Sequence, residues 1–258
     1  MSTYAQRLAA AISDRGRLCV GIDPMASVLD AWGLNNDVAG LEACARGIVE
    51  QLGGTVAVFK PQSAFFEAHG SAGVAVLERL LVDIREAGAL SILDVKRGDI
   101  GSSMAGYASA FLGEGAPLWA DAITLSPYLG VGSLSPAIDA AVAGGQGLYV
   151  LARTSNPDGA TIQLAETAEG TVAQHVVDVA ASLNETRDNA IGLVVGATHA
   201  DSGCRLDAFN GSLLVPGIGA QGGDVEATLN AGKTANGGKP GTGLMINSSR
   251  AILYAGKG

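Results

Sequence analysis

The sequence is poor in charge, in aromatic residues and in cysteine. Charged side chains make up 16% of its 258 residues and aromatic ones 5%, against 48% hydrophobic residues, which argues against a disordered chain. The three cysteines, Cys19, Cys44 and Cys204, are odd in number, widely spaced and without a Cys-x-x-Cys pair. This usage argues against a zinc motif and predicts core thiols in a reducing compartment.

Positive charge is scarce as well. Acidic residues outnumber lysine and arginine by 25 to 16, and the formal net charge is -9. Because phosphate backbones are bound mainly through lysine and arginine, this balance argues against a general nucleic-acid surface. A small anionic ligand would require the few basic residues to gather at one place.

No segment has the pattern of a membrane span or a secretion signal. The first 18 residues include arginines and lack an apolar core, and the longest uncharged span, residues 122–138, is interrupted by proline and glycine. We therefore expect a cytoplasmic protein without a membrane partner. The histidines, His69, His175 and His199, lack metal-ligand spacing, so no metal site is expected.

What the sequence does contain is a series of short apolar runs. Strand candidates lie at residues 18–22, 55–59, 90–93, 122–125, 148–151, 191–195, 213–215 and 244–246. Continuous apolar runs are typical of strands covered on both faces, and helical patterns such as residues 73–82 and 171–177 separate most of them. Eight such units in about 250 residues predict one α/β domain, residues 1–258, folded as a (β/α)8 TIM barrel.

An open doubly wound sheet is the competing arrangement, and the residues that follow the runs favour the barrel. Polar or turn-forming groups stand after every run, among them Asp23, Lys60, Asp94, Ser126 and Asn247. In a barrel the carboxyl ends of the strands converge on one rim, where the active sites of this fold lie. Residues 156–170 and 232–243 are expected to be mobile loops.

The most charged of these strand ends reads LDVKRGDIGSS, residues 93–103. Residues two apart in a strand point to the same side, so Asp94 and Lys96 are expected to face the barrel interior while Val95 packs outward. Asp99 lies past the strand in a glycine-containing turn. By itself, an Asp-x-Lys pair at a strand end is more often structural than catalytic.

The full segment resembles the signature of orotidine 5′-phosphate decarboxylases, Asp-x-Lys-x-x-Asp-Ile followed by a hydroxyl residue, here Ser103 in place of the more usual threonine. Further motifs of the family stand in order at other strand ends: GIDP (21–24), FKPQSAFFE (59–67), SPYLG (126–130), RTSNP (153–157), PGIGAQGG (216–223) and NSSR (247–250). The sequence is similar to the longer bacterial members. The resemblance implies a homodimer with shared active sites that converts orotidine 5′-phosphate to uridine 5′-phosphate (UMP) without a cofactor.

By resemblance, Lys60, Asp94, Lys96 and Asp99 form a catalytic network of alternating charge, with Asp99 contributed by the partner subunit. Alternation is favourable because like charges about 4 Å apart would cost roughly 4 kcal/mol at an effective dielectric constant near 20. Loss of CO2 leaves an electron pair at C6 of the pyrimidine that the ring π system cannot accept directly. A positioned cation must stabilise that pair, and Lys96 is the predicted proton donor.

The resemblance also implies which residues bind the substrate. Asp23 and Ser103 are expected to contact the ribose hydroxyls, Ser103 from the partner subunit. Ser155, or Thr154 beside it, is expected to contact the pyrimidine edge.

The phosphate is expected at the glycine-rich loop 216–223 and the last strand. Gln221 in that loop and Arg250 beyond the strand are the residues implied to hold it, because an arginine supplies both charge and directional donors.

Two other functions fit parts of the pattern. Metal-dependent decarboxylases of phosphosugar barrels carry a similar Asp-x-Lys-x-x-Asp run, but they hold magnesium with an acidic residue at the end of the second strand, where this chain has Lys60. A non-catalytic nucleotide-binding barrel would be expected to have lost a catalytic charge, whereas all four are present. Both observations favour an enzyme that uses neither a metal nor a cofactor.

Overall fold

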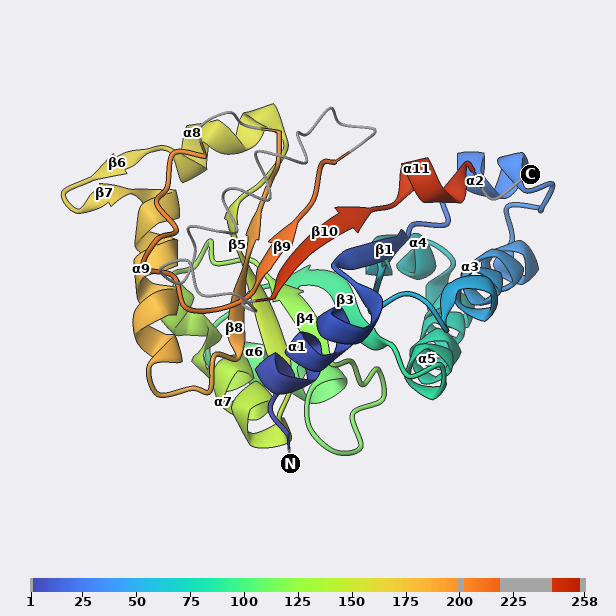
Figure 1. Cartoon of the computed structure of the whole chain (residues 1–258), viewed down its shortest axis with the longest axis horizontal. Coiled ribbons are helices and arrows are strands. Elements are labelled where there is room, and N and C mark those ends of the chain that lie inside the picture. Colours follow the sequence, from blue (N-terminus) through green and yellow to red (C-terminus); the bar gives the residue numbers. More distant parts are fainter. Residues whose placement is uncertain (1, 199–201, 219–242, 256–258) are drawn as a thin grey trace.

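The computed structural model describes residues 2–198, 202–218 and 243–255, and eight parallel strands within these ranges close into a barrel (Figure 1). Their order around the barrel is β1, β10, β9, β8, β5, β4, β3, β2. The closed barrel confirms the predicted fold over the open sheet. The strands are β1 (Leu18–Ile22), β2 (Val58–Pro61), β3 (Leu90–Arg97), β4 (Ala122–Leu125), β5 (Gly147–Arg153), β8 (Ile191–Val195), β9 (Leu213–Val215) and β10 (Leu244–Ser248).

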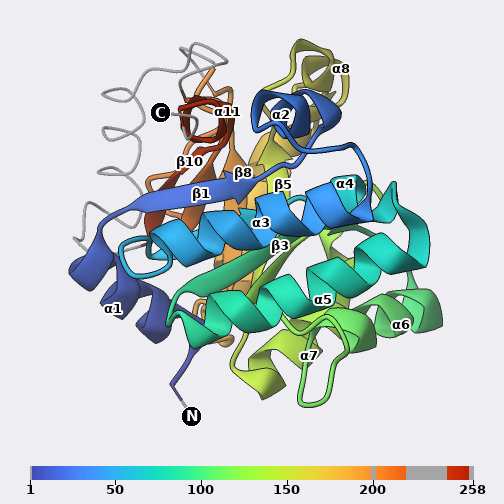
Figure 2. The same ribbon diagram turned by 90° about the vertical axis from the view of Figure 1, so that its right-hand side faces the viewer.

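Helices cover the outside of the barrel, and α3 (Val38–Leu52) and α5 (Gly70–Glu86) lie side by side on one flank (Figure 2). Each presents an apolar stripe to the strands, for example Leu41 and Ile48 in α3 and Leu77 and Ile84 in α5. Within the described ranges, no helix has the length and hydrophobicity that crossing a membrane requires. The other α-helices in the described part of the chain are α1 (Tyr4–Arg15), α2 (Ala26–Ala31), α4 (Ser63–Glu67), α6 (Gly101–Phe111), α7 (Ser135–Gly144), α8 (Ala160–Gln163), α9 (Val172–Asn184) and α11 (Arg250–Leu253).

Several sequence-based boundaries are wrong. Strands β3, β5 and β10 are longer than their expected apolar runs, and two other segments differ more. The second strand, expected at residues 55–59, is β2 at Val58–Pro61, because the amides of Thr55 and Val56 bond back to Leu52 in a turn that ends α3. The segment 156–170, expected to be a loop, contains a 3-10 turn (Pro157–Gly159), helix α8 and the start of the projecting hairpin β6–β7 (Glu166–Thr167 and Gly170–Thr171; Figure 1). The second expected loop, residues 232–243, falls outside the described residues except for Gly243.

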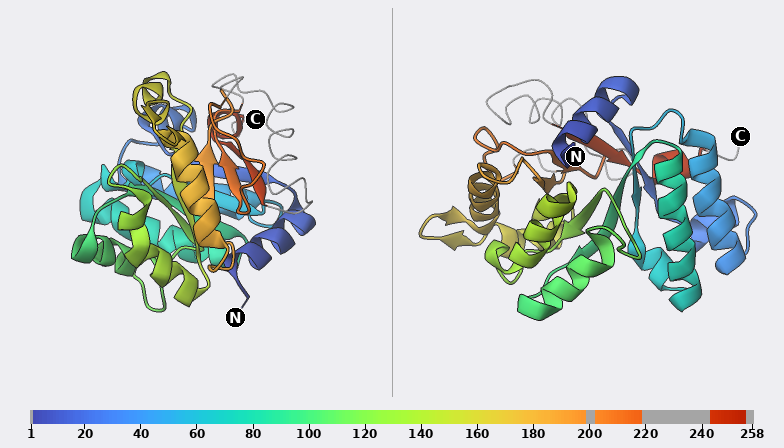
Figure 3. Two further views of the ribbon diagram at one scale, coloured as in Figure 1. Left: turned by 90° about the vertical axis from the view of Figure 1, so that its left-hand side faces the viewer. Right: turned by 90° about the horizontal axis from the view of Figure 1, so that it is seen from below.

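Helix α1 closes the amino-terminal end of the barrel (Figure 3). The Tyr4 side chain, 1% exposed, places its hydroxyl 2.9 Å from that of Tyr149 in β5, and Ser212 Oγ donates to Tyr149 Oη over 2.8 Å. A Cβ at Gly147 or Gly192 would collide with these two rings, so glycine is required there. The barrel is therefore filled at this end, and its opposite rim is the end available for chemistry.

Candidate active site

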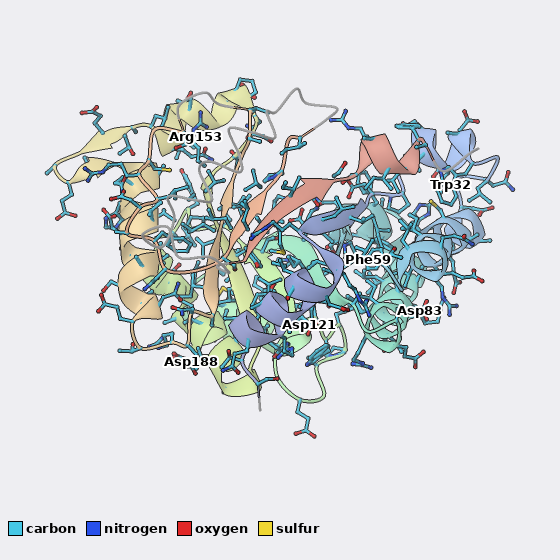
Figure 4. All side chains as sticks on the ribbon, viewed as in Figure 1. Trp32, Phe59, Asp83, Asp121, Arg153 and Asp188 are labelled. Atoms are coloured by element: carbon cyan, nitrogen blue, oxygen red, sulfur yellow. The ribbon has the colours of Figure 1, made fainter. Side chains whose placement is uncertain are left out.

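Two adjoining pockets lie at the carboxyl-terminal rim of the barrel, as the sequence predicted. Figure 4 marks this end by Arg153 near α8, with Asp121 at the opposite end beside α1. The pockets have volumes of about 330 and 170 Å³ and share Lys60 and Pro216. The larger is lined by Lys60, Asp94, Lys96, Thr124, Leu151, Thr154, Ser155, Asn156, Val194, Leu214 and Pro216. The smaller is lined by Asp23, Lys60, Pro216, Gly217, Ile218, Asn247, Ser249, Arg250 and Ala251.

The larger pocket brings together three of the four residues of the predicted charge network, Lys60, Asp94 and Lys96. Lys60 Nζ donates to Asp94 Oδ2 over 2.9 Å, and Lys96 Nζ donates to Asp94 Oδ1 over 2.7 Å. The side chains of Lys60 and Asp94 are 7% and 9% exposed, whereas that of Lys96 is 46% exposed. Two strands thus hold one buried carboxylate between two ammonium groups, and the more accessible ammonium belongs to Lys96.

The electrostatics of the network favour its charged form. Burial opposes the ionisation of Asp94, but the ammonium groups of Lys60 and Lys96 outweigh it and hold the pKa of Asp94 well below its ordinary value. Burial likewise opposes the charge on Lys60, and Asp94 and Asp23 outweigh it and raise the pKa of Lys60 above its ordinary value. Both groups are therefore charged at neutral pH.

Strand β3 is irregular where it carries these charges. It pairs with β4 at Leu93 and again at Arg97, and the register shifts between the two. Lys96 lies in this interval with φ 45°, in the left-handed region that residues with a Cβ seldom adopt. Its N–H donates to Thr124 Oγ1 in β4 over 2.9 Å, and Val95 packs outward in the core between strands and helices.

The smaller pocket brings together Asp23 after β1 and Asn247, Ser249 and Arg250 at the end of β10. Among the described residues, neither Asp23 Oδ1 nor Asn247 Oδ1 has a hydrogen-bond partner, although both atoms are buried. Gly21 in β1 lets Ser249 approach, because a Cβ at this position would overlap Ser249 Oγ. The pocket therefore combines an arginine with acceptor oxygens that a donor group on a ligand could satisfy.

Gln163 of α8 fixes Thr154, one of the residues that line the larger pocket. Its Oε1 accepts from the Thr154 N–H and from Arg153 Nη1, each over 3.0 Å, and its Nε2 donates to Thr154 Oγ1 over 2.8 Å. Thr154 and Ser155 both line the pocket. The choice between them as the pyrimidine contact therefore stays a prediction.

The remaining predicted residues lie away from the network within this chain. Asp99 follows β3, and its Oδ1 accepts from the Ile100 N–H over 2.8 Å; no ion pair joins it to Lys60 or Lys96 among the described residues. Ser103 is exposed in the first turn of α6. Gln221 lies outside the described residues.

Two of the three cysteines lie in the core. Cys19 and Cys44 are buried, as predicted for core thiols, whereas Cys204 is half-buried. Burial raises the pKa of Cys19 to about 12 and that of Cys44 to about 11, so both stay protonated. In the described ranges no group of three or more histidine, cysteine, aspartate or glutamate residues is placed to hold a metal.

Sequence reasoning missed three residues at the site: Thr124, Asn247 as a lining residue, and Gln163. Thr124 gave no sequence signal of a functional role, because threonine is common in strands. Asn247 carried a usable signal, since it is a polar residue at a strand end. Gln163 had none, because it lies in a segment expected to be a loop.

Comparison with known proteins agrees with this geometry. Residues 16–258 match the family model described as Orotidine 5'-phosphate decarboxylase / HUMPS family. The chain is 56% identical over 225 residues to the orotidine 5'-phosphate decarboxylase of Salinispora tropica, covering 86% of this chain and 81% of that one. It is 48% identical over 262 residues to the enzyme of that name from Corynebacterium efficiens, covering 98% and 91%.

Solved structures give the same result. A crystal structure of a Streptomyces avermitilis protein assigned as an orotidine 5'-phosphate decarboxylase superposes with a TM-score of 0.90 at 50% identity, covering 99% of this chain and 89% of that one. The structure of Leishmania donovani OMP decarboxylase superposes with a TM-score of 0.79 at 30% identity, covering 97% and 91%.

Proposed function

The chain belongs to the orotidine 5'-phosphate decarboxylase / HUMPS family, and from this we propose that it is a carboxy-lyase that converts orotidine 5′-phosphate to UMP and CO2 in pyrimidine nucleotide synthesis. One observation favours this activity over that of a metal-dependent relative. A buried carboxylate, Asp94, lies between Lys60 and Lys96 at the rim of the barrel. The position that a metal-dependent relative would give to an acidic ligand holds the Lys60 ammonium instead.

The proposed reaction needs no cofactor. The bond between C6 and the carboxylate carbon breaks, CO2 leaves, and the electron pair stays on C6. The Lys96 ammonium, 2.7 Å from Asp94 and the more exposed of the two, stabilises that pair and transfers its proton to C6. A solvent proton then restores the Lys96 ammonium, so each turnover consumes one proton and releases one CO2.

The two pockets divide the substrate by its chemistry. Lys96, Thr154 and Ser155 all line the larger pocket, and this lining suits the pyrimidine ring. Arg250 in the smaller pocket suits the phosphate, with Gln221 as its proposed second contact. Asp23 supplies an unbonded acceptor oxygen for a ribose hydroxyl, which is a donor.

We further propose that two chains form a dimer in which Asp99 and Ser103 complete the partner's site. Both residues lie just beyond β3, and large apolar side chains are exposed in the same part of the chain: Ile100 (62% exposed), Tyr107, Tyr128 (77% exposed) and Leu129. An apolar patch of this kind is typical of an interface between subunits. The buried, protonated thiols of Cys19 and Cys44 support the cytoplasm as the place of action.

The deciding experiment is to follow the ultraviolet change of orotidine 5′-phosphate with purified protein, with and without a chelator and added Mg²⁺. We expect turnover that the chelator leaves unchanged. Lys96→Ala should abolish turnover, while Arg46→Ala, which removes an exposed cation on α3, should not. A wild-type protein without turnover contradicts the assignment, and turnover that is lost with chelator and restored by Mg²⁺ contradicts the metal-free mechanism.

A further inference from the structure

We propose that Thr124 is a positioning residue, whose hydroxyl holds Asp94 and the backbone of Lys96 in the geometry that the decarboxylation needs. The proposal rests on the proposed function for its activity measurements. Its structural part, that one hydroxyl holds the irregular end of β3, can be measured separately.

Thr124 Oγ1 makes one bond as an acceptor and one as a donor. It accepts from the Lys96 N–H over 2.9 Å and lies 2.8 Å from Asp94 Oδ1. The amide can only donate, and the ionised carboxylate can only accept, so the hydroxyl proton points at Asp94. Asp94 Oδ1 also accepts from Lys96 Nζ over 2.7 Å. The hydroxyl therefore fixes both ends of the Lys96 residue, its backbone directly and its ammonium through the carboxylate.

The hydroxyl takes a role that a strand normally gives to a backbone carbonyl. Leu93 is opposite Ile123 and Arg97 is opposite Leu125, so β3 has two more residues than β4 in this interval. Thr124 is the β4 residue facing that extra length, and its side chain accepts from Lys96 where the regular ladder is interrupted. The excess residues allow Asp94 and Lys96 to lie close together at the rim.

The backbone of Lys96 also requires support from its surroundings. With φ 45°, Lys96 is one of a few described non-glycine residues in the left-handed region, a conformation that a residue with a Cβ keeps only when neighbouring groups hold it. Thr124 is 1% exposed and lies in the middle of a buried strand, so its own position is fixed by packing. The buried strand β4 thus positions the irregular end of β3.

The test compares Thr124→Val, which keeps the shape and removes the hydroxyl, with Thr124→Ser, which keeps the hydroxyl. We expect Thr124→Val to lower kcat by about 10- to 100-fold, the effect of losing a bond to a charged group. Its affinity for UMP should stay within about threefold of wild type, because UMP binding does not need the proton donor in place. Thr124→Ser should recover most of the activity.

Ser91→Ala is the matched control. Ser91 is a buried hydroxyl in β3, the strand that carries Lys96, and it is bonded to Asp121 at the opposite end of the barrel. Its loss should reduce thermal stability and leave kcat unchanged. Hydrogen exchange at the Lys96 amide gives a readout independent of turnover: we expect exchange about tenfold faster in Thr124→Val and unchanged in Ser91→Ala.

Several results would overturn the inference: wild-type kcat in Thr124→Val, an equal loss of kcat in Ser91→Ala, or Lys96 exchange that does not respond to the hydroxyl. If Thr124→Val does not fold, Thr124→Ala removes the same hydroxyl without adding a methyl group against Asp94. If the wild-type protein does not decarboxylate, the proposed function fails, and the exchange measurement still decides whether Thr124 holds Lys96.

Discussion

At the scale of single residues, the two oxygens of Asp94 organise the rim. Oδ2 accepts from Lys60, and Oδ1 accepts from both Lys96 and Thr124. Removing one member of a buried ion pair typically costs about 3–5 kcal/mol, because its partner is left charged without compensation. Asp23 also acts on Lys60, so the rim alternates cations and carboxylates, and the half-exposed Lys96 ammonium is the cation available to a carbanion.

The lowered pKa of Asp94 leads to a prediction about stability and pH. The pKa in the folded chain lies below the ordinary value of 3.8, so the ionised carboxylate adds stability above that pH, and this stability is lost as the pH falls through the folded-state pKa. Asp94→Asn cannot titrate. We expect the free energy of unfolding of wild type, relative to Asp94→Asn, to rise with pH up to about pH 5 and stay level above it.

Urea unfolding of both proteins between pH 3 and 8 measures this difference. The rise between pH 3 and 8 should be about 1 kcal/mol, because the unfolded carboxyl, with its ordinary pKa of 3.8, is mostly but not fully protonated at pH 3. Asp83→Asn, on an exposed pair with Arg46, is the control that should show little change. A difference that is flat at every pH would mean that Asp94 is not held ionised by its neighbours.

At the scale of elements, the contact between β1 and the end of β10 predicts an effect on substrate binding. In Gly21→Ala, the new Cβ overlaps Ser249 Oγ, so Ser249 and the adjoining Arg250 must shift. We expect KM to rise by about tenfold with kcat within about threefold, because the network around Asp94 is untouched. Steady-state kinetics with orotidine 5′-phosphate measures the split.

Gly47→Ala in α3 is the matched glycine control. The nearest atom to a Cβ there is 4.0 Å away, on Trp32, and alanine is favoured over glycine inside a helix. Its kinetics should equal those of wild type. If Gly21→Ala lowers kcat as strongly as it raises KM, then β1 also positions the catalytic charges, and the division between the two pockets is wrong.

The sequence predicted elements well where an apolar run coincides with a strand. β1, β4, β8 and β9 begin and end at the expected residues, since their interiors are filled by apolar side chains. Strand β3 extends to Arg97, four residues past its apolar run, because at the rim the barrel interior accommodates charges and hydropathy no longer marks the strand. The register shift beside Thr124 had no sequence signal, since it depends on how two strands of different length pair.

At the scale of the whole molecule, the location of Asp99 predicts that an active site needs two chains. Mixing Lys96→Ala with Asp99→Ala protein should restore activity to two inactive proteins. Half of the dimers are mixed, and one of their two sites is intact, so about a quarter of wild-type activity is expected. The assay follows decarboxylation after the two proteins exchange subunits.

The control mixes Lys96→Ala with Asp94→Ala. Both substitutions fall in the network that one chain builds by itself, at 2.7 Å from each other, so no mixed dimer has an intact site and no activity should return. Equal activity in both mixtures, or none in the first when mixed dimers are demonstrated, would show that Asp99 serves its own chain or no site.

The pairing of β1 with β10 has a consequence for how the chain is made. The barrel closes when Leu18 and Cys19 come to lie opposite Ile246 and Asn247, residues separated by more than two hundred positions. During synthesis, one edge of β1 therefore stays unpaired until β10 has left the ribosome. Unpaired strand edges favour aggregation. Arg250, the proposed phosphate ligand, lies just after β10. Pairing of β10 with β1 therefore closes the barrel and places Arg250 at the anion site in one step. A partly synthesised chain has neither a closed barrel nor an anion site.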